Sequence, residues 1–325
     1  MTKTILYKSS DSNYLEAVCN LLQAGKIVAL PTETVYGLAA DALNTDAVRK
    51  IFIAKGRPNN HPLIVHIKNE SKLNLWAKNI PPIVYKLSKL FWPGPLTLIL
   101  EKNDNINTIV TGGLNTIALR VPSHSIIQNI LNEIDGLAAP SANLFKTISP
   151  TNASHVLKTL EGKIDAIVDD GPCKLGLEST ILDLTTKIPT ILRPGPISKF
   201  MIEECLGYKI SQPYNHNSQV SGNMKEHYKP ATTTIMLKTD EILEFLITQN
   251  KHKSISIINY SNIDFMNFNV ISFKIAANKE EYSKNIYNLM HIADEQNSSL
   301  IIIEMPPQII EWSDVLNRLT KATAS

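Results

Sequence analysis

The sequence has few cysteines, and the three present, Cys19, Cys173 and Cys205, lie far apart without forming a CxxC pair. This spacing excludes a disulfide-stapled domain and a cysteine-based zinc site, and it favours reduced, mostly buried thiols. An excess of one charge is also missing, because 32 basic and 30 acidic side chains leave a net charge of +2. Neither half has the positive excess typical of proteins whose main ligand is nucleic acid, so we expect no stable DNA binding.

Long hydrophobic runs are absent too. The longest apolar stretches, such as Leu300 to Ile303, have the length of a strand, whereas a membrane span needs about 18 apolar residues. The N-terminus, MTKTILYKSS, lacks the basic and then apolar pattern of a secretory signal. We therefore expect a cytoplasmic protein with no membrane partner.

Several familiar catalytic motifs cannot be found. The chain contains no GxxxxGK[ST] phosphate loop, no GxGxxG dinucleotide turn, no GxSxG elbow and no HExxH pair. The eight histidines show no tight metal-ligand spacing, so no protein-held metal site is predicted. The common routes to nucleotide, metal and serine-hydrolase chemistry are thus missing.

The composition is that of a globular protein, with 43% hydrophobic and 19% charged residues in a chain of 325. Strand-like and helix-like segments alternate over the first two-thirds, which predicts an α/β sheet. Several strands follow one another without a helix, so the sheet should be mixed rather than purely parallel. Asp46 is expected to cap a helix that ends at Lys55, with Gly56 directly after it.

The periodicity disappears after about residue 206 and returns near residue 232. Between them lies a polar stretch with Pro and Gly that reads as a linker. We therefore predict a large α/β domain over residues 1–206, a linker over 207–231 and a small α/β domain over 232–325.

Three potential cations, Lys55, Arg57 and His61, lie within the segment KGRPNNHP. A solvated turn is the ordinary interpretation of such a segment, and it would place these side chains outside any core. A rigid loop carrying Lys and Arg is equally what a fold without a phosphate loop would use to bind an anion. The two interpretations are evenly matched.

Other polar residues follow apolar strands. Arg120 and Arg193 each end a strand just before a turn with proline, where open α/β sheets collect ligands. Ser141 and Asn143 follow another short strand, and turn formation alone explains such residues. His66 within LIVHI is more typical of a satisfied core histidine than of a catalytic one.

Taken in order, these segments resemble a known family. PTETVYGLAADA, AKGRPNNHPLIVHI, WPGPLTLIL, TIALRVPSH, AAPSANLFKTISPT, GLESTI and ILRPGPI closely resemble threonylcarbamoyl-AMP synthases with a YrdC-like catalytic domain. The family's KxR…SxN signature corresponds to Lys55, Arg57, Ser141 and Asn143. The segment SGNMKEHYKP is similar to the linker of the long, two-domain members.

The resemblance implies a fold and a reaction. The fold would be a YrdC-like domain with a twisted mixed sheet and flanking helices, followed by a smaller Rossmann-like α/β domain. The reaction would join L-threonine, bicarbonate or CO2, and ATP into L-threonylcarbamoyl-AMP with release of pyrophosphate, which makes the chain a nucleotidyltransferase. ATP enters as a substrate with Mg²⁺. Partner machinery would then transfer the threonylcarbamoyl group to tRNA.

The resemblance also implies roles for individual residues. Lys55 and Arg57 would be catalytic. The residues expected around threonine and its carbamate are Thr34, His66, Arg120, Ala139 and Ser179. The residues expected around ATP are Lys55, Arg57, His61, Thr116, Ser141, Asn143, Ser149 and Arg193. His227 and Tyr228 of the linker would belong to a lid over the active-site opening.

Two alternatives remain open at this stage. One is an RNA-binding maturation factor of the same fold that performs no chemistry, against which the near-neutral charge counts. The other is a carbamoyl-transfer enzyme of hydrogenase maturation, whose zinc-finger domain would require CxxC pairs that this chain lacks.

Overall fold

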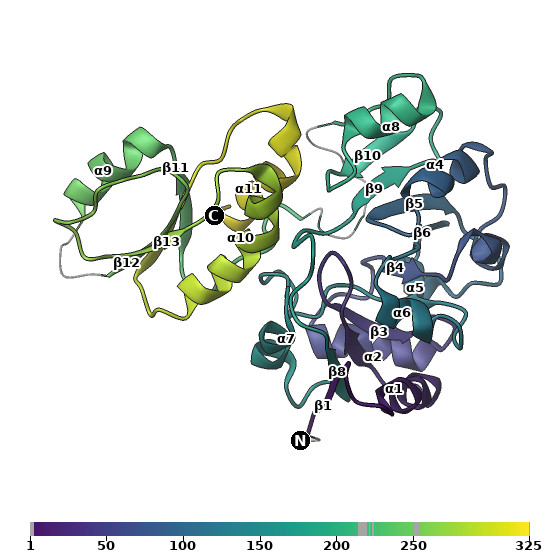
Figure 1. Cartoon of the computed structure of the whole chain (residues 1–325). Helices are drawn as coiled ribbons and strands as arrows, with labels where there is room; N and C mark the ends of the chain where they lie inside the picture. The colour runs from purple at the N-terminus through teal and green to yellow at the C-terminus, as the bar shows by residue number, and fades with distance from the viewer. Residues whose placement is uncertain (1–2, 214–219, 221, 223, 250–253, 325) are drawn as a thin grey trace. The chain divides into compact units, whose positions relative to one another are not determined.

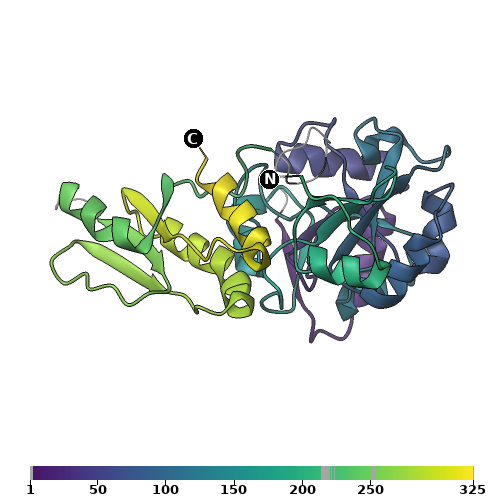
Figure 2. The same cartoon turned by 90° about the horizontal axis from the view of Figure 1, so that it is seen from above.

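The computed structural model describes residues 3–213, 220, 222, 224–249 and 254–324. The chain forms two compact units (Figures 1 and 2). The first unit comprises residues 1–145, 150–174 and 178–223, and the second comprises 146–149, 175–177 and 224–325. Within the described ranges no helix is long and apolar enough to span a bilayer.

The described part of the first unit is built on one mixed sheet. Its strands lie in the order β1 (Ile5–Lys8), β8 (Ala166–Asp169), β2 (Val28–Leu30), β3 (Gly37–Asp41), β7 (Leu137–Ala138), β4 (Ile64–His66), β6 (Thr116–Arg120), β5 (Leu96–Glu101), β9 (Thr180–Asp183) and β10 (Thr190–Arg193). The sheet contains both parallel pairs, such as β4–β6, and antiparallel pairs, such as β5–β6. The prediction of a mixed α/β sheet is confirmed.

Helices cover this sheet on both faces. They are α1 (Tyr14–Gln23), α2 (Thr45–Lys55), α3 (Leu73–Trp76), α4 (Ile83–Phe91), α5 (Thr108–Thr111), α6 (Ser125–Ile130), α7 (Ala153–Leu160) and α8 (Lys199–Leu206), with a 3₁₀ turn, η1 (Glu70–Lys72). Successive strand residues point to opposite faces. Val28 and Leu30 therefore pack in a cluster with α1 and α6, whereas Ala29 packs in the larger cluster with α2 and α4.

The start of α2 differs from the prediction. Asn44, not Asp46, caps the helix, since its side chain accepts hydrogen bonds from the backbone N–H groups of Asp46 and Ala47. Asp46 occupies the first turn, where its charge interacts favourably with the helix dipole. The helix ends at Lys55 as expected, and Gly56 adopts the left-handed conformation with φ of 60°.

The described part of the second unit has a parallel sheet in the order β11 (Thr234–Leu237), β14 (Leu300–Glu304), β12 (Ile255–Asn259) and β13 (Val270–Lys274). Its helices are α9 (Thr239–Thr248), α10 (Lys279–Asp294) and α11 (Ser313–Ala322), and η2 (Ile310–Trp312) precedes α11. Ile257 and Ile302 pack against α9 in one cluster. This is the smaller Rossmann-like part that the resemblance implied.

The HYKP segment is packed within the second unit. The backbone N–H of His227 donates to the carbonyl of Lys321, and the buried Tyr228 ring stacks on Tyr287 with 5.7 Å between centroids. Lys229 N–H donates to the carbonyl of Lys146. This pairing explains why residues 146–149 belong to the second unit although they lie inside the expected catalytic domain.

Candidate active site

A polar row crosses one face of the first unit's sheet. His66 on β4 pairs in register with Arg120 on β6, and Arg120 pairs with Thr97 on β5. The residues that precede them on the same strands, such as Val65 and Leu119, point to the opposite face and belong to the main core. Period-two alternation thus separates a polar row from an apolar core within the same three strands.

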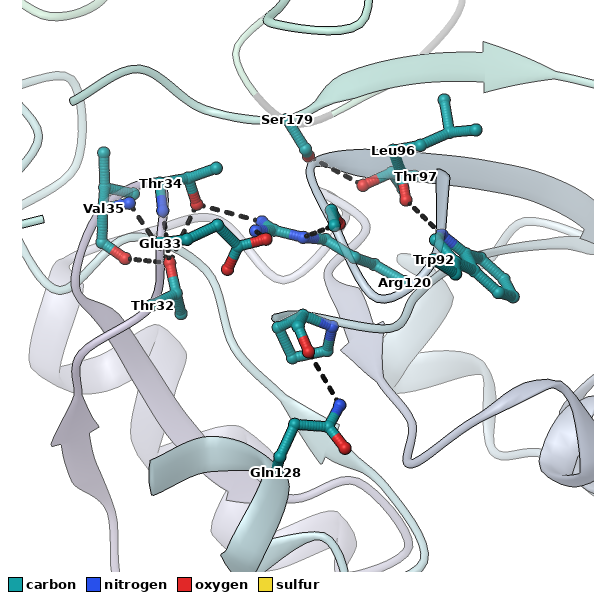
Figure 3. Close-up of polar contacts among 12 residues, drawn as sticks. Thr32, Glu33, Thr34, Val35, Trp92, Leu96, Thr97, Arg120, Gln128 and Ser179 are labelled. Atoms are coloured by element: carbon teal, nitrogen blue, oxygen red, sulfur yellow. Dashed lines mark hydrogen bonds and ion pairs between the residues drawn. The ribbon is translucent and has the colours of Figure 1, made fainter. Parts of the chain in front are cut away.

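The loop after β2 faces this row with a tightly bonded turn (Figure 3). The Thr32 hydroxyl accepts hydrogen bonds from the N–H groups of Thr34 at 3.1 Å and Val35 at 3.2 Å, and it donates to the Val35 carbonyl at 2.7 Å. Side chains of this type commonly close such local turns. The turn fixes the backbone of Glu33 and Thr34, so that both side chains reach Arg120.

Arg120 is held at all three guanidinium nitrogens (Figure 3). Its Nε donates to the Gly94 carbonyl at 3.2 Å, and Nη1 donates to Thr34 Oγ1 at 3.0 Å. Its Nη2 lies 2.6 Å from Glu33 Oε1 in a buried ion pair. The guanidinium therefore has one fixed orientation.

His66, next to Arg120 in register, is buried. Burial, and secondly the Arg120 charge, hold the pKa of His66 well below its usual value, so the ring is neutral at physiological pH. Within the described chain its Nδ1 atom has no hydrogen-bond partner. A buried polar atom of this kind is available to a ligand, which argues against a satisfied core histidine.

Ser179 extends the polar row. Its hydroxyl lies 2.7 Å from Thr97 Oγ1, and its carbonyl accepts from Nε and Nη2 of Arg193 at 3.0 and 2.9 Å. Gly195 is required beside it, because a Cβ there would lie 2.4 Å from the backbone nitrogen of Thr180. Arg193 is thus anchored by the same residue that presents a hydroxyl toward the row.

Lys55 and Arg57 are buried, with 2% and 6% of their surface exposed. Lys55 Nζ donates to the carbonyls of Ser141 at 2.5 Å and Asn143 at 2.6 Å. Burial, and then the Arg57 charge, lower the pKa of Lys55 well below its usual value. The expectation that the two side chains lie outside the core in a solvated turn is wrong, because the 141–145 loop covers them.

An aromatic ring supports the other cations of this segment. Arg57 Nη2 donates to the Pro62 carbonyl at 2.9 Å, and the guanidinium carbon lies 5.8 Å from the centre of the Phe145 ring. The His61 ring meets the same Phe145 edge-on at 5.3 Å. Burial, and then Arg57, lower the pKa of His61. His61 is therefore neutral at physiological pH, whereas the Arg57 guanidinium on the ring face remains a cation for an anionic ligand.

The structure brings most of the predicted residues together in the first unit. Ser141 pairs with Gly37, which follows the 31–36 loop, and the Ala139 N–H donates to the Ile64 carbonyl. Thr116 begins β6 and lines a small cavity of about 20 Å³ with Ile64 and Val220. Ser149, His227 and Tyr228 belong to the second unit.

Sequence reasoning missed three participants, Glu33, Thr32 and Thr97. Glu33 stands between two threonines in PTETVYG, and a carboxylate directly after a buried strand is a usable signal. Thr97 lies two residues before Ile99, just as His66 lies two residues after Ile64, and Ile64 and Ile99 pack in the same cluster. The alternation of side chains along a strand would therefore have placed Thr97 on the same face as His66.

Fold and site together define an α/β protein with a polar, cation-rich sheet face of the YrdC type. Residues 20–195 match the family described as "Telomere recombination", which groups Sua5, YciO and YrdC. Residues 197–324 match the one described as "Threonylcarbamoyl-AMP synthase, C-terminal domain". The chain belongs to the threonylcarbamoyl-AMP synthase family.

Relatives match over nearly the whole chain. The threonylcarbamoyl-AMP synthase of Pyrococcus abyssi is 36% identical over 95% of this chain and 94% of that protein. The synthase of Bacillus subtilis is 38% identical over 97% and 94%. A crystal structure of P. abyssi Sua5 complexed with L-threonine superposes with a TM-score of 0.92 at 34% identity, covering 99% of this chain and 98% of that one.

Proposed function

We propose that this chain synthesises L-threonylcarbamoyl-AMP from L-threonine, bicarbonate or CO2, and ATP, with release of pyrophosphate. The observation that carries the proposal is the fixed, buried Arg120 beside Thr34 and the neutral His66. A guanidinium held in this way suits a substrate carboxylate, because two parallel N–H groups match its two oxygens. The family supports threonine as the amino acid.

Threonine and its carbamate would occupy the polar row. Arg120 would bind the threonine carboxylate, and Thr34 and Ser179 would pair with its hydroxyl. His66 Nδ1 and the backbone of Ala139 would complete this side. The free amine attacks CO2 to give a carbamate, so these contacts mainly orient the amine and exclude water.

ATP would lie toward the buried cations. Lys55 and Arg57 are the proposed catalytic residues, and the other expected contacts are His61, Thr116, Ser141, Asn143, Ser149 and Arg193. A carbamate oxygen attacks the α-phosphorus while pyrophosphate leaves, and negative charge develops on the phosphoryl oxygens. Lys55, which we expect to lie between the two substrates, would stabilise that charge in a step of the nucleotidyltransferase class.

Mg²⁺ would enter with the nucleotide. Among the described residues no group of three or more His, Cys, Asp or Glu side chains is arranged to hold a metal. We therefore place the ion on phosphate oxygens and water, which is how Mg²⁺ commonly accompanies a triphosphate.

The segment 207–231 would cover the site, although its residues 214–219, 221 and 223 lie outside the described part of the chain. Val220 packs on the same sheet face as the polar row, against Ile64, Ile99 and Ile181. A cover there would protect the acyl-phosphate anhydride from water. His227 and Tyr228 would take part in this lid. For the domain boundaries we keep the sequence prediction as a proposal. Transfer of the threonylcarbamoyl group to tRNA would follow in the cytoplasm through partner machinery.

One experiment tests the proposal directly. The protein is incubated with ATP, Mg²⁺, bicarbonate and a single amino acid, and the nucleotide product is identified by mass spectrometry. Threonine should give the adenylate, whereas valine should be disfavoured by roughly 10²–10⁴-fold because it leaves buried polar groups unpaired. Equal turnover of valine would refute the assignment of Thr34 and Ser179.

A further inference from the structure

Glu33 is a buried carboxylate to which the proposed chemistry gives no role. Only 4% of its surface is exposed, and its Oε1 lies 2.6 Å from Nη2 of Arg120. Within the described residues neither carboxylate oxygen accepts a well-aligned hydrogen bond. Glu33 therefore acts through its charge more than through hydrogen bonding, and that charge is directed at the guanidinium.

Arg120 does not need Glu33 to be held in place. The Gly94 carbonyl and Thr34 Oγ1 already accept from two of its nitrogens, which is enough to fix a planar group. Removing two charges from water has a desolvation cost that such a pair does not always recover in stability. A buried carboxylate at this point therefore calls for a functional explanation.

Lys55, another buried basic residue of the site, has a different environment. Lys55 donates to two neutral carbonyl oxygens, and its nearest charged influence is the cation Arg57. That end of the site is net positive and suits a polyanion. The Arg120 end is neutral overall, because the Glu33 charge cancels that of the guanidinium.

We propose that Glu33 makes the Arg120 subsite selective for a zwitterionic amino acid over a plain anion. This inference rests on the proposed function, in which Arg120 binds the threonine carboxylate. A neutral Arg–Glu pair complements a zwitterion, because the guanidinium attracts the carboxylate and the Glu33 charge attracts the adjacent ammonium. The same carboxylate repels phosphates, so ATP and pyrophosphate are directed to the Lys55 end.

Other charges near Glu33 are consistent with a strong local field. The Glu33 charge helps to raise the pKa of the buried Cys173 thiol to about 12, although burial is the larger cause. Burial lowers the pKa of His124, and the charges of Asp170 and, to a smaller extent, Glu33 oppose that shift. These effects show that the negative charge of Glu33 reaches beyond its contact with Arg120.

The test compares two ligands that differ in one group. L-threonine carries an ammonium, and 2,3-dihydroxybutanoate of matching stereochemistry carries a hydroxyl in its place. Binding of both is measured by calorimetry to wild type, to Glu33→Gln and to Glu203→Gln, a change of equal charge on the distant helix α8. Inhibition of threonine binding by pyrophosphate is measured in the same three proteins.

Wild type and Glu203→Gln should prefer threonine by about 10- to 100-fold. Glu33→Gln should bind threonine about 10-fold more weakly, bind 2,3-dihydroxybutanoate at least as tightly as wild type does, and become more sensitive to pyrophosphate. Parallel weakening of both ligands would reduce Glu33 to a support for Arg120 and overturn the inference. Absence of any preference in wild type would overturn it too, whether or not the variant folds. Failure of wild type to bind threonine at all would instead refute the proposed function.

Discussion

Two buried glutamates, one in each unit, show how differently the protein treats an interior carboxylate. Glu304, at the end of β14, is fully buried and accepts from Thr239 Oγ1 at 2.7 Å and from the N–H groups of Tyr260 and Ser261 at 2.7 and 2.8 Å. Glu33 in the first unit has an arginine beside it and no aligned hydrogen bond among the described residues. A carboxylate with complete hydrogen bonding stabilises a fold, whereas one with unused acceptors serves a ligand.

The same contrast extends to the surroundings of each glutamate. In the first unit the buried His66 Nδ1 of the polar row has no hydrogen-bond partner among the residues that the structure describes. In the second unit acidic side chains accept hydrogen bonds from the backbone. Asp294, for example, accepts from the N–H groups of Ala231 and Thr232. Among the described residues Trp76 Nε1 and Tyr282 Oη also lack a partner, so it is the combination of unpaired atoms with buried charges that distinguishes the polar row.

The largest expected effect is a difference in turnover between substitutions at two buried lysines of the first unit. Lys55→Met should lower turnover by roughly 10²-fold or more, because it removes a cation from a step that develops negative charge. Lys102 is the matched control, since it is also buried and donates Nζ to two carbonyls, those of Asn103 and Ile106. Lys102→Met should destabilise to a similar extent but leave turnover unchanged. Pyrophosphate release and thermal melting measure the two effects, and equal losses of turnover would contradict a special role for Lys55.

The second prediction concerns Glu304. Glu304→Gln replaces an acceptor with a donor opposite backbone N–H groups, so the free energy of unfolding should fall by about 2–3 kcal/mol. Threonine binding by the folded protein should not change. Urea denaturation and calorimetry test this, and a loss of threonine affinity without a loss of stability would break the comparison between the two glutamates.

The third prediction compares two glycines of the first unit. Gly195→Ala would force a Cβ against the backbone beside Ser179, and Gly136→Ala would force one to 2.4 Å from the Trp76 ring. Each change should destabilise by about 1–3 kcal/mol through overpacking. Only Gly195→Ala should also raise KM for threonine, because it displaces Ser179. Steady-state kinetics at a temperature where both variants are folded will show whether their KM values differ.

The smallest expected effect is a pH dependence of stability. Burial and Arg120 hold the pKa of folded His66 well below 6.5, so below that pH the unfolded chain binds more protons than the folded one. Stability is therefore fully present above about pH 6.5 and falls on acidification, by at most about 1.4 kcal/mol per pH unit for this group. His66→Asn should flatten the decline between pH 7 and 5. His61→Asn, at a less buried position, should flatten it less, and identical slopes in both variants would contradict the assignment.

Much of the fold and part of the site could be predicted from the sequence. Alternation of apolar segments indicated the mixed sheet, and Gly56 marked the end of α2. The KxR…SxN pattern predicted Lys55 and Arg57 as site residues, which stays a prediction, whereas the solvated turn offered for them was wrong because both are buried. Periodicity reports only local structure. The loop that buries these side chains, residues 141–145, begins 86 residues after Lys55 in the chain.

By itself the sequence determined the residue types and the faces on which they lie, because a strand alternates side chains and a turn closes on its own threonine. Only the tertiary structure decided which strands are neighbours, and thereby that His66, Arg120 and Thr97 form one row. It also decided that Glu33 opposes Arg120 instead of facing water. The physical reason is that strand order and burial depend on contacts between distant segments, and the environment of a charge depends on that burial.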